Sequence, residues 1–124
     1  MIRKLFVAAA LFAAPHMPAT AQGFTGNTLL ESCTAGENDP MLAICISYIS
    51  GVRDSLDAMK EGGVTEFGSP SIKLPCIRTA VTNGQIQAVV VKWLNENPRF
   101  RDYRAWNIIF FSVAQSFPCN SANG

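Results

Sequence analysis

Asp54 and Asp57 are the pair of side chains whose types and spacing could support acid–base chemistry. They lie one turn apart in an amphipathic segment, so their carboxylates could share one face of a helix. Such a pair needs burial to separate its two pKa values, whereas the neighbouring Arg53 and Lys60 indicate a solvated face. We therefore predict no catalytic role for these aspartates.

The N-terminus has the organisation of a secretory signal peptide. Cations at positions 3 and 4 precede a short apolar run over residues 5–14, and residues 19–21 read Ala-Thr-Ala, the A-x-A form of a cleavage site. The apolar run is much shorter than the roughly 20 residues that a membrane-spanning helix needs. We predict a signal peptide over residues 1–21, an exported domain over residues 22–124 and no membrane span after processing.

Removal of this segment would also remove the one histidine of the chain, His16. A domain without histidine cannot form a Ser-His-Asp or Cys-His site, nor a metal centre with imidazole ligands. The serines that lie near the aspartates, Ser47, Ser50 and Ser55, then have no imidazole base to activate them. We therefore expect no enzyme activity, no metal and no cofactor.

The four cysteines survive the predicted cleavage, and their number is even. In a small exported domain this predicts two disulfides. No two of them are spaced as Cys-x-x-Cys, which makes a zinc site or a redox motif improbable. The cysteines are Cys33, Cys45, Cys76 and Cys119.

Composition sets the remaining limits. The chain has 124 residues, of which 48% are hydrophobic and 15% charged, and its formal net charge is +1. This length predicts one domain, and the apolar fraction is too high for a disordered chain. The near-neutral charge argues against a nucleic-acid-binding protein, which usually carries a basic surplus.

Apolar residues at spacings of three and four predict an all-α fold: a compact four-helix domain with one short and three longer helices. The short helix covers about residues 27–34, and the second begins at Pro40 after an Asp39 cap and ends at Gly62. The third begins with the capping box at Thr82 and stops before Pro98, and the fourth covers about residues 102–117. Residues 63–75 are predicted to be a loop, and no segment is a convincing strand.

Two details of the helix faces can be checked. Gly51 interrupts the second helix, and we interpret it as a place where another helix packs closely. The fourth helix is predicted to bury one apolar stripe, formed by Tyr103, Trp106, Phe110, Val113 and Phe117.

The helix arrangement favours one of the three possible disulfide connectivities. The third and fourth helices are joined by a short connection and should therefore be antiparallel, so the start of one lies near the end of the other. Cys76 precedes this pair and Cys119 follows it, whereas Cys33 and Cys45 flank the turn between the first two helices. We predict the pairs Cys33–Cys45 and Cys76–Cys119.

Candidate partner contacts lie around the start of the fourth helix. Arg99, Arg101 and Arg104 stand among aromatic residues, which suits either a contact patch for an acidic partner or glycan, or a solvated rim around a core. Ile108 and Phe111 point away from the predicted stripe, so they form either a second packing face or an exposed patch for a homodimer or another partner. The loop over residues 62–75 is a further candidate.

Several short sequences occur in an order typical of one family. The pieces are GNTLL at residues 26–30 with Cys33, CISYISG at 45–51 with Asp54, Cys76, VTNGQ at 81–85, VVVKWL at 89–94 with Asn97-Pro98, and FPC at 117–119. The chain resembles the Rap/Tai family of periplasmic immunity proteins, which act against peptidoglycan amidase effectors of type VI secretion. The resemblance implies a small, mostly helical, disulfide-bonded domain, and it implies a buried hydrogen-bonding role for Asp54.

The function implied by this resemblance is inhibition of a cell-wall amidase effector by blocking its active site, in the periplasm and without catalysis. The resemblance assigns no contact residues. Two other functions remain open from the sequence: a periplasmic chaperone or stress protein, and a helical protein that binds a small ligand between its helices.

Overall fold

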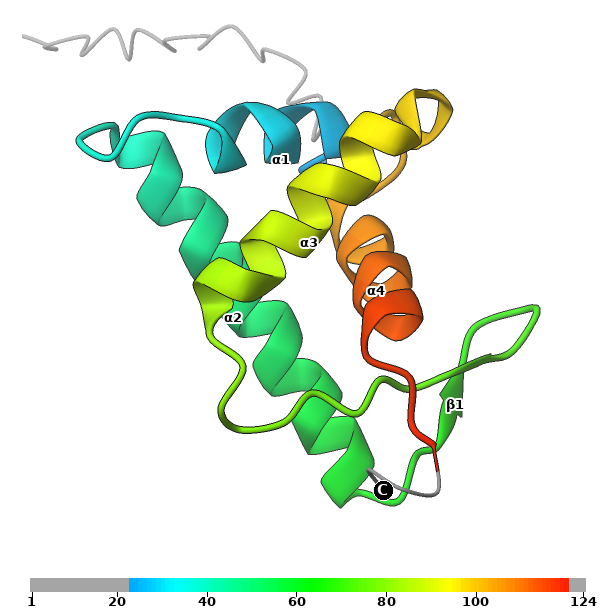
Figure 1. Cartoon of the computed structure of the whole chain (residues 1–124). Helices are drawn as coiled ribbons and strands as arrows, with labels where there is room; N and C mark the ends of the chain where they lie inside the picture. Colours follow the sequence, from blue (N-terminus) through cyan, green and yellow to red (C-terminus); the bar gives the residue numbers. More distant parts are fainter. Residues whose placement is uncertain (1–22, 121–124) are drawn as a thin grey trace, which may run out of the picture.

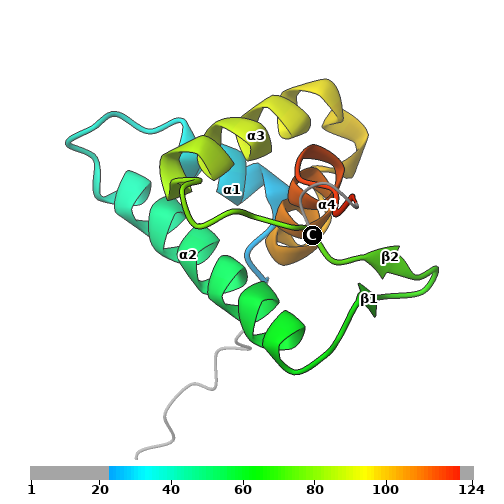
Figure 2. The same ribbon diagram turned by 60° about the horizontal axis from the view of Figure 1, so that its bottom comes forward.

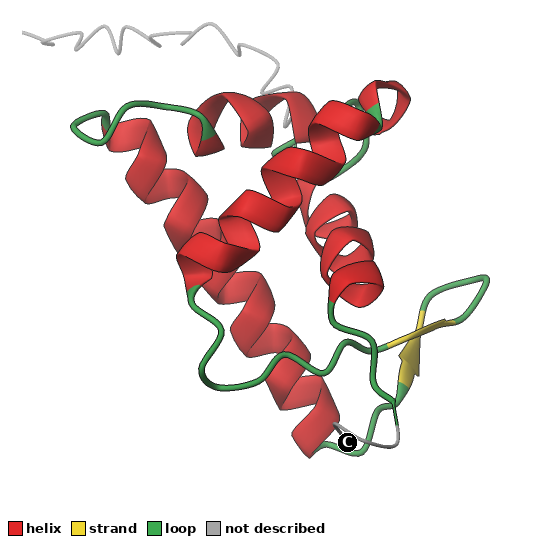
Figure 3. Ribbon diagram, viewed as in Figure 1, coloured by secondary structure: helices red, strands yellow, loops and turns green. Residues whose placement is uncertain are grey.

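The computed structural model describes residues 23–120, and the predicted signal peptide lies outside these residues. These residues form four α-helices, with a two-stranded hairpin between the second and third helices and a short 3-10 helix before the fourth (Figure 1, Figure 3). No described helix is long and apolar enough to cross a membrane.

The first two helices begin at side-chain caps. α1 covers Gly26–Cys33, and α2 covers Pro40–Glu61. The Asp39 carboxylate accepts a 2.9 Å hydrogen bond from the backbone N–H of Met41, and Pro40 occupies the first helical position, as predicted. α2 is the longest element, and α1 lies across its beginning (Figure 1).

The capping box at Thr82 opens α3, Asn83–Glu96. The Thr82 hydroxyl accepts from the N–H of Gln85 at 3.1 Å, and the Gln85 side chain accepts from the N–H of Thr82 at 2.8 Å. This reciprocal pair satisfies two helix-end donors and confirms the predicted start of the third helix.

The fourth helix begins later than predicted. A 3-10 helix, η1, covers Pro98–Phe100, and α4 covers Ala105–Ser116. The backbone just before α4 pairs instead with the segment that precedes α1: the N–H of Gly26 donates to the carbonyl of Tyr103, and the N–H of Ala105 donates to the carbonyl of Phe24. These bonds flank a bridge between Thr25 and Arg104 that holds Arg104 extended, which prevents an earlier helix start.

The segment predicted to be a loop contains a small hairpin, so the fold is mostly helical but not strictly all-α. β1, Glu66–Phe67, pairs antiparallel with β2, Ile72–Lys73, and Phe67 lies opposite Ile72. Gly68 turns the chain with a φ of 93°, which suits glycine. The hairpin projects beyond the helices on the side of α4 (Figure 2). Two residues per strand leave too short a pattern for sequence to reveal.

The core lies between the four helices. Its fully buried side chains include Leu29, Ile49, Ile86, Val90, Leu94, Ile109 and Val113. α4 buries more than one stripe of its surface, because Ile108 is 1% exposed and Ile109 is equally buried, whereas Trp106 on the predicted stripe is 37% exposed. The predicted close packing at Gly51 is wrong: this residue is exposed, and a β-carbon there would meet nothing within 4 Å.

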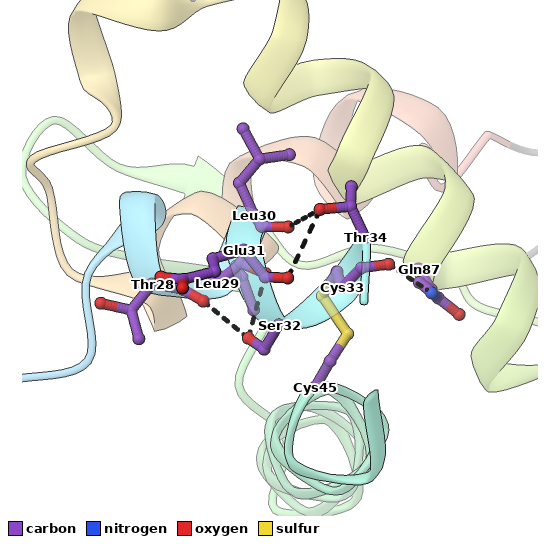
Figure 4. The surroundings of a disulfide bond; sticks show 9 residues. All are labelled: Thr28, Leu29, Leu30, Glu31, Ser32, Cys33, Thr34, Cys45 and Gln87. Carbon is purple, nitrogen blue, oxygen red and sulfur yellow. Dashed lines mark hydrogen bonds between the residues drawn. A yellow bond between two sulfur atoms is a disulfide. The ribbon is translucent and has the colours of Figure 1, made fainter. Parts of the chain in front are cut away.

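Both disulfides have the predicted connectivity. Cys33–Cys45 joins the end of α1 to the first turns of α2, and both residues are buried (Figure 4). The carbonyl of Cys33 also accepts a 2.7 Å hydrogen bond from the side-chain amide of Gln87 on α3. Cys76–Cys119 joins the segment after β2 to the chain beyond α4.

Candidate binding surface

The two aspartates that could have formed an acid–base pair are not buried together. Asp54 is exposed, which contradicts the buried hydrogen-bonding role expected for it, and Asp57 is only half-buried. Within residues 23–120 no three His, Cys, Asp or Glu side chains lie close enough together to hold a metal ion.

Several aromatic rings lie together at the surface where the hairpin meets α4. Phe67 of β1 packs edge-on against Trp106 and Phe110 of α4, with ring centroids 5.9 Å and 5.8 Å apart. Phe67 and Trp106 nevertheless remain 39% and 37% exposed. Large half-exposed aromatic side chains of this kind are typical anchors of protein–protein interfaces.

These rings line a groove of about 490 Å³ between the hairpin and α4. Its wall on one side is the hairpin turn, including Pro70 and Ile72, and its opposite wall is the first turns of α4. We call this the aromatic groove, and we define it by Phe67, Ile72, Tyr103, Trp106, Phe110 and Phe111.

Two smaller apolar hollows adjoin the aromatic groove. One of about 220 Å³ lies between α2 and α4, where Val52 and Met59 face Phe67 and Trp106. The other, of about 290 Å³, lies between α3 and α4, where Trp93 and Phe100 stand beside Tyr103 and Phe111. The three hollows share aromatic walls and lie side by side around the start of α4. Together they form a continuous apolar patch, which is larger than the single exposed apolar residues that are common on protein surfaces.

The predicted arginine cluster is divided between two roles. The Arg99 guanidinium lies 4.6 Å above the ring of Phe100 and remains exposed. Arg101 serves the fold: its Nε donates to the carbonyl of Leu94 at 2.9 Å, and its own carbonyl accepts from the N–H of Asn27 at 2.7 Å. Arg104 is exposed immediately before α4.

Arg104 also lies beside a tyrosine. Burial raises the pKa of the Tyr48 phenol above its ordinary value, while the backbone N–H of Trp106 and the charge of Arg104 oppose this shift. The Tyr48 ring packs against Phe24, with centroids 4.7 Å apart. Tyr48 therefore packs behind the first residues of α4, on the side that faces Phe24, and does not belong to the outer surface of this helix.

The two predicted apolar contacts have different positions. Ile108 is buried in the core, so the structure corrects its assignment as a contact residue: it packs against the start of α1 near Gly26. Phe111 is half-buried and lines the aromatic groove. Phe67 lies in the candidate loop over residues 62–75, whereas Tyr103 and Trp106, which were predicted to be buried in the stripe of the fourth helix, are 47% and 37% exposed.

Comparison with known families gives one match. Residues 25–119 match the profile of the Rap1a immunity proteins. The chain belongs to this family. The match covers α1 through the second disulfide, and it agrees with the resemblance found in the sequence. No curated protein and no solved structure gives a match. Members of an immunity family act by binding a protein effector and are generally not enzymes.

Proposed function

We propose that this protein is exported to the periplasm, where it binds and inhibits a peptidoglycan-hydrolysing amidase effector of type VI secretion through the aromatic groove. The proposal is supported by membership of the Rap1a immunity family and by the signal-like sequence of residues 1–21. The single observation that carries the contact surface is the half-exposed pair of Phe67 and Trp106.

An inhibitor that blocks an active site needs a surface complementary in shape to that site and a few anchoring side chains, but no catalytic residues of its own. The hairpin projects from the helices, so it can enter a concave site on a partner (Figure 2). The helices behind it are held by buried side chains and a buried disulfide. A projecting element on a rigid support binds with little loss of conformational freedom.

The test begins with the oxidised exported chain, mixed with cell-wall amidases encoded in the same genome. We expect one amidase to form a complex of defined stoichiometry by size-exclusion chromatography and to lose its cleavage of purified peptidoglycan. No complex and no inhibition with any of these amidases would contradict the proposal.

Variants then locate the contact. We expect Trp106→Ala to weaken binding by about 2 kcal/mol or more, which is roughly thirtyfold in Kd. The matched control is Ile44→Ala, because Ile44 is 47% exposed on the first turns of α2, away from the hairpin. Equal loss of binding in the two variants would remove the aromatic groove from the proposal.

A further inference from the structure

The two disulfides differ in what surrounds their sulfur atoms. Cys33 and Cys45 are 4% and 0% exposed, enclosed by α1, α2 and α3 (Figure 4). Cys119 is exposed and Cys76 is half-buried. A reductant reaches an exposed disulfide without unfolding the domain, whereas a buried one must first be uncovered.

The surroundings of Cys76–Cys119 also favour its opening. The Lys60 ammonium near the end of α2 lies 3.4 Å from the Sγ of Cys76. A hollow of about 460 Å³ adjoins Cys119, and Lys60, Lys73 and Glu66 line it. Nearby lysines attract an attacking thiolate and stabilise a departing one.

This disulfide holds the base of the hairpin against the end of α4. The N–H of Cys76 donates to the carbonyl of Phe117 at 2.8 Å, and the Sγ of Cys119 lies 3.3 Å from the carbonyl oxygen of Leu74. Leu74 follows β2 directly, and its N–H donates to the carbonyl of Thr65 across the hairpin. The covalent bond therefore anchors the segment that places Phe67 and Ile72.

We propose that Cys76–Cys119 is a reducible bond that controls the aromatic groove: when a dithiol opens it, the hairpin is released while the four helices stay folded. The effect on partner binding rests on the proposed function, whereas the selective opening does not. The chain would then present its complete groove only in an oxidising compartment.

The chemistry is two thiol–disulfide exchanges with a dithiol reductant. A thiolate of the dithiol attacks the Sγ of Cys119, the protein S–S bond breaks, and its electron pair leaves on the Sγ of Cys76 beside Lys60. The second thiolate of the dithiol then attacks the dithiol sulfur that is bonded to Cys119 in the mixed disulfide. The bond between that sulfur and Cys119 breaks, and Cys119 leaves as a thiolate. The dithiol is oxidised to a disulfide, and its two protons pass to the two cysteines.

Graded reduction of the oxidised chain tests this directly. After incubation with increasing dithiothreitol, free thiols are alkylated and their positions read by peptide mass spectrometry. We expect Cys76 and Cys119 to be labelled at dithiothreitol concentrations at least about tenfold below those that label Cys33 and Cys45. Simultaneous labelling of all four, or earlier labelling of the buried pair, would overturn the proposal.

Two further measurements separate the parts of the proposal. Lys60→Met should slow reduction about two- to fivefold, as for an exposed charge contact, and Lys92→Met, at an exposed lysine of α3, should not. Hydrogen exchange of the partly reduced chain should speed up at amides of residues 65–74 and stay slow in α1–α4. Unchanged exchange in the hairpin would show that the bond does not hold it.

The partner assay distinguishes the two proposals. If the oxidised chain binds no amidase, the proposed function fails and the selective opening is judged by labelling alone. If the oxidised and partly reduced chains bind an amidase equally well, control of the groove is refuted while the proposed function stands.

Discussion

The ring of Phe67, carried by a two-residue strand, meets the ring of Trp106 edge-on at a centroid distance of 5.9 Å. This contact joins a hairpin with few hydrogen bonds of its own to a well-packed helix. The position of the hairpin therefore depends on aromatic packing and on the neighbouring disulfide more than on strand pairing.

Phe67→Ala should loosen the hairpin without unfolding the helices. The variant loses two edge-on aromatic contacts, each worth about 0.5–1.5 kcal/mol. We expect faster hydrogen exchange at residues 65–74 and a fall in the free energy of unfolding of about 1–3 kcal/mol. A hairpin that exchanges as slowly as in the wild type would show that Phe67 does not hold it.

Gly26→Ala should be destabilising because there is no room for a methyl group. A β-carbon at this position would collide with the Cδ1 of Ile108 and lie 2.9 Å from the carbonyl oxygen of Arg101. We expect a loss of about 1–3 kcal/mol, as for other over-packed sites. Urea unfolding measures it, and an unchanged midpoint would contradict the packing at α1.

Gly51→Ala is the matched substitution at an open position. A β-carbon there meets nothing within 4 Å, and the residue lies inside α2. Alanine costs less backbone entropy than glycine in a helix, so we expect a gain of about 0.5–1 kcal/mol. A loss of stability would indicate that the exposed face of α2 has a packing partner in solution.

Arg53, which was predicted to lie on a solvated face, bonds α2 to the loop before α3. Its guanidinium donates to the carbonyls of Val81 and Arg78. Arg53→Met keeps the apolar stem and removes both bonds, so we expect a loss of about 1–3 kcal/mol in urea unfolding. Arg78→Met, which leaves the Arg78 carbonyl in place, is the control and should change stability by less than about 0.5 kcal/mol.

Tyr48 should contribute to a loss of stability in alkaline solution. Its phenol has a raised pKa in the folded protein, above the ordinary 10.0, so the folded state holds the proton more tightly than the unfolded chain. This contribution is complete below about pH 10 and is lost as the pH rises further. Tyr48→Phe should therefore lose less stability than the wild type between about pH 9 and 11, and equal losses would contradict the assignment.

Local signals in the sequence were sufficient for the helices that begin at caps. Asp39-Pro40 and the capping box at Thr82 are recognisable because each side chain bonds to backbone within three residues. The start of α4 was misplaced because its determinant is distant: residues 24–26 hold the chain extended before Ala105.

The candidate site was predictable only in part. The aromatic types near the start of α4 were evident, but which of them face solvent depends on how the helix turns against α1 and α2. Trp106, which was predicted to be buried, is 37% exposed beside the hairpin, whereas Ile108 belongs to the second packing face because the start of α1 packs on it.

Each disulfide closes a covalent ring in the chain. One ring contains residues 33–45, the other contains residues 76–119, and residues 46–75 connect the two. A single proteolytic cut inside either ring leaves the chain in one covalent piece. A cut in the projecting hairpin lies between the rings, so it yields two fragments that are held together by noncovalent contacts alone, chiefly the packing of α1 and α2 on α3 and α4. The most exposed element of the fold is thus also the place where one broken peptide bond separates the molecule into halves.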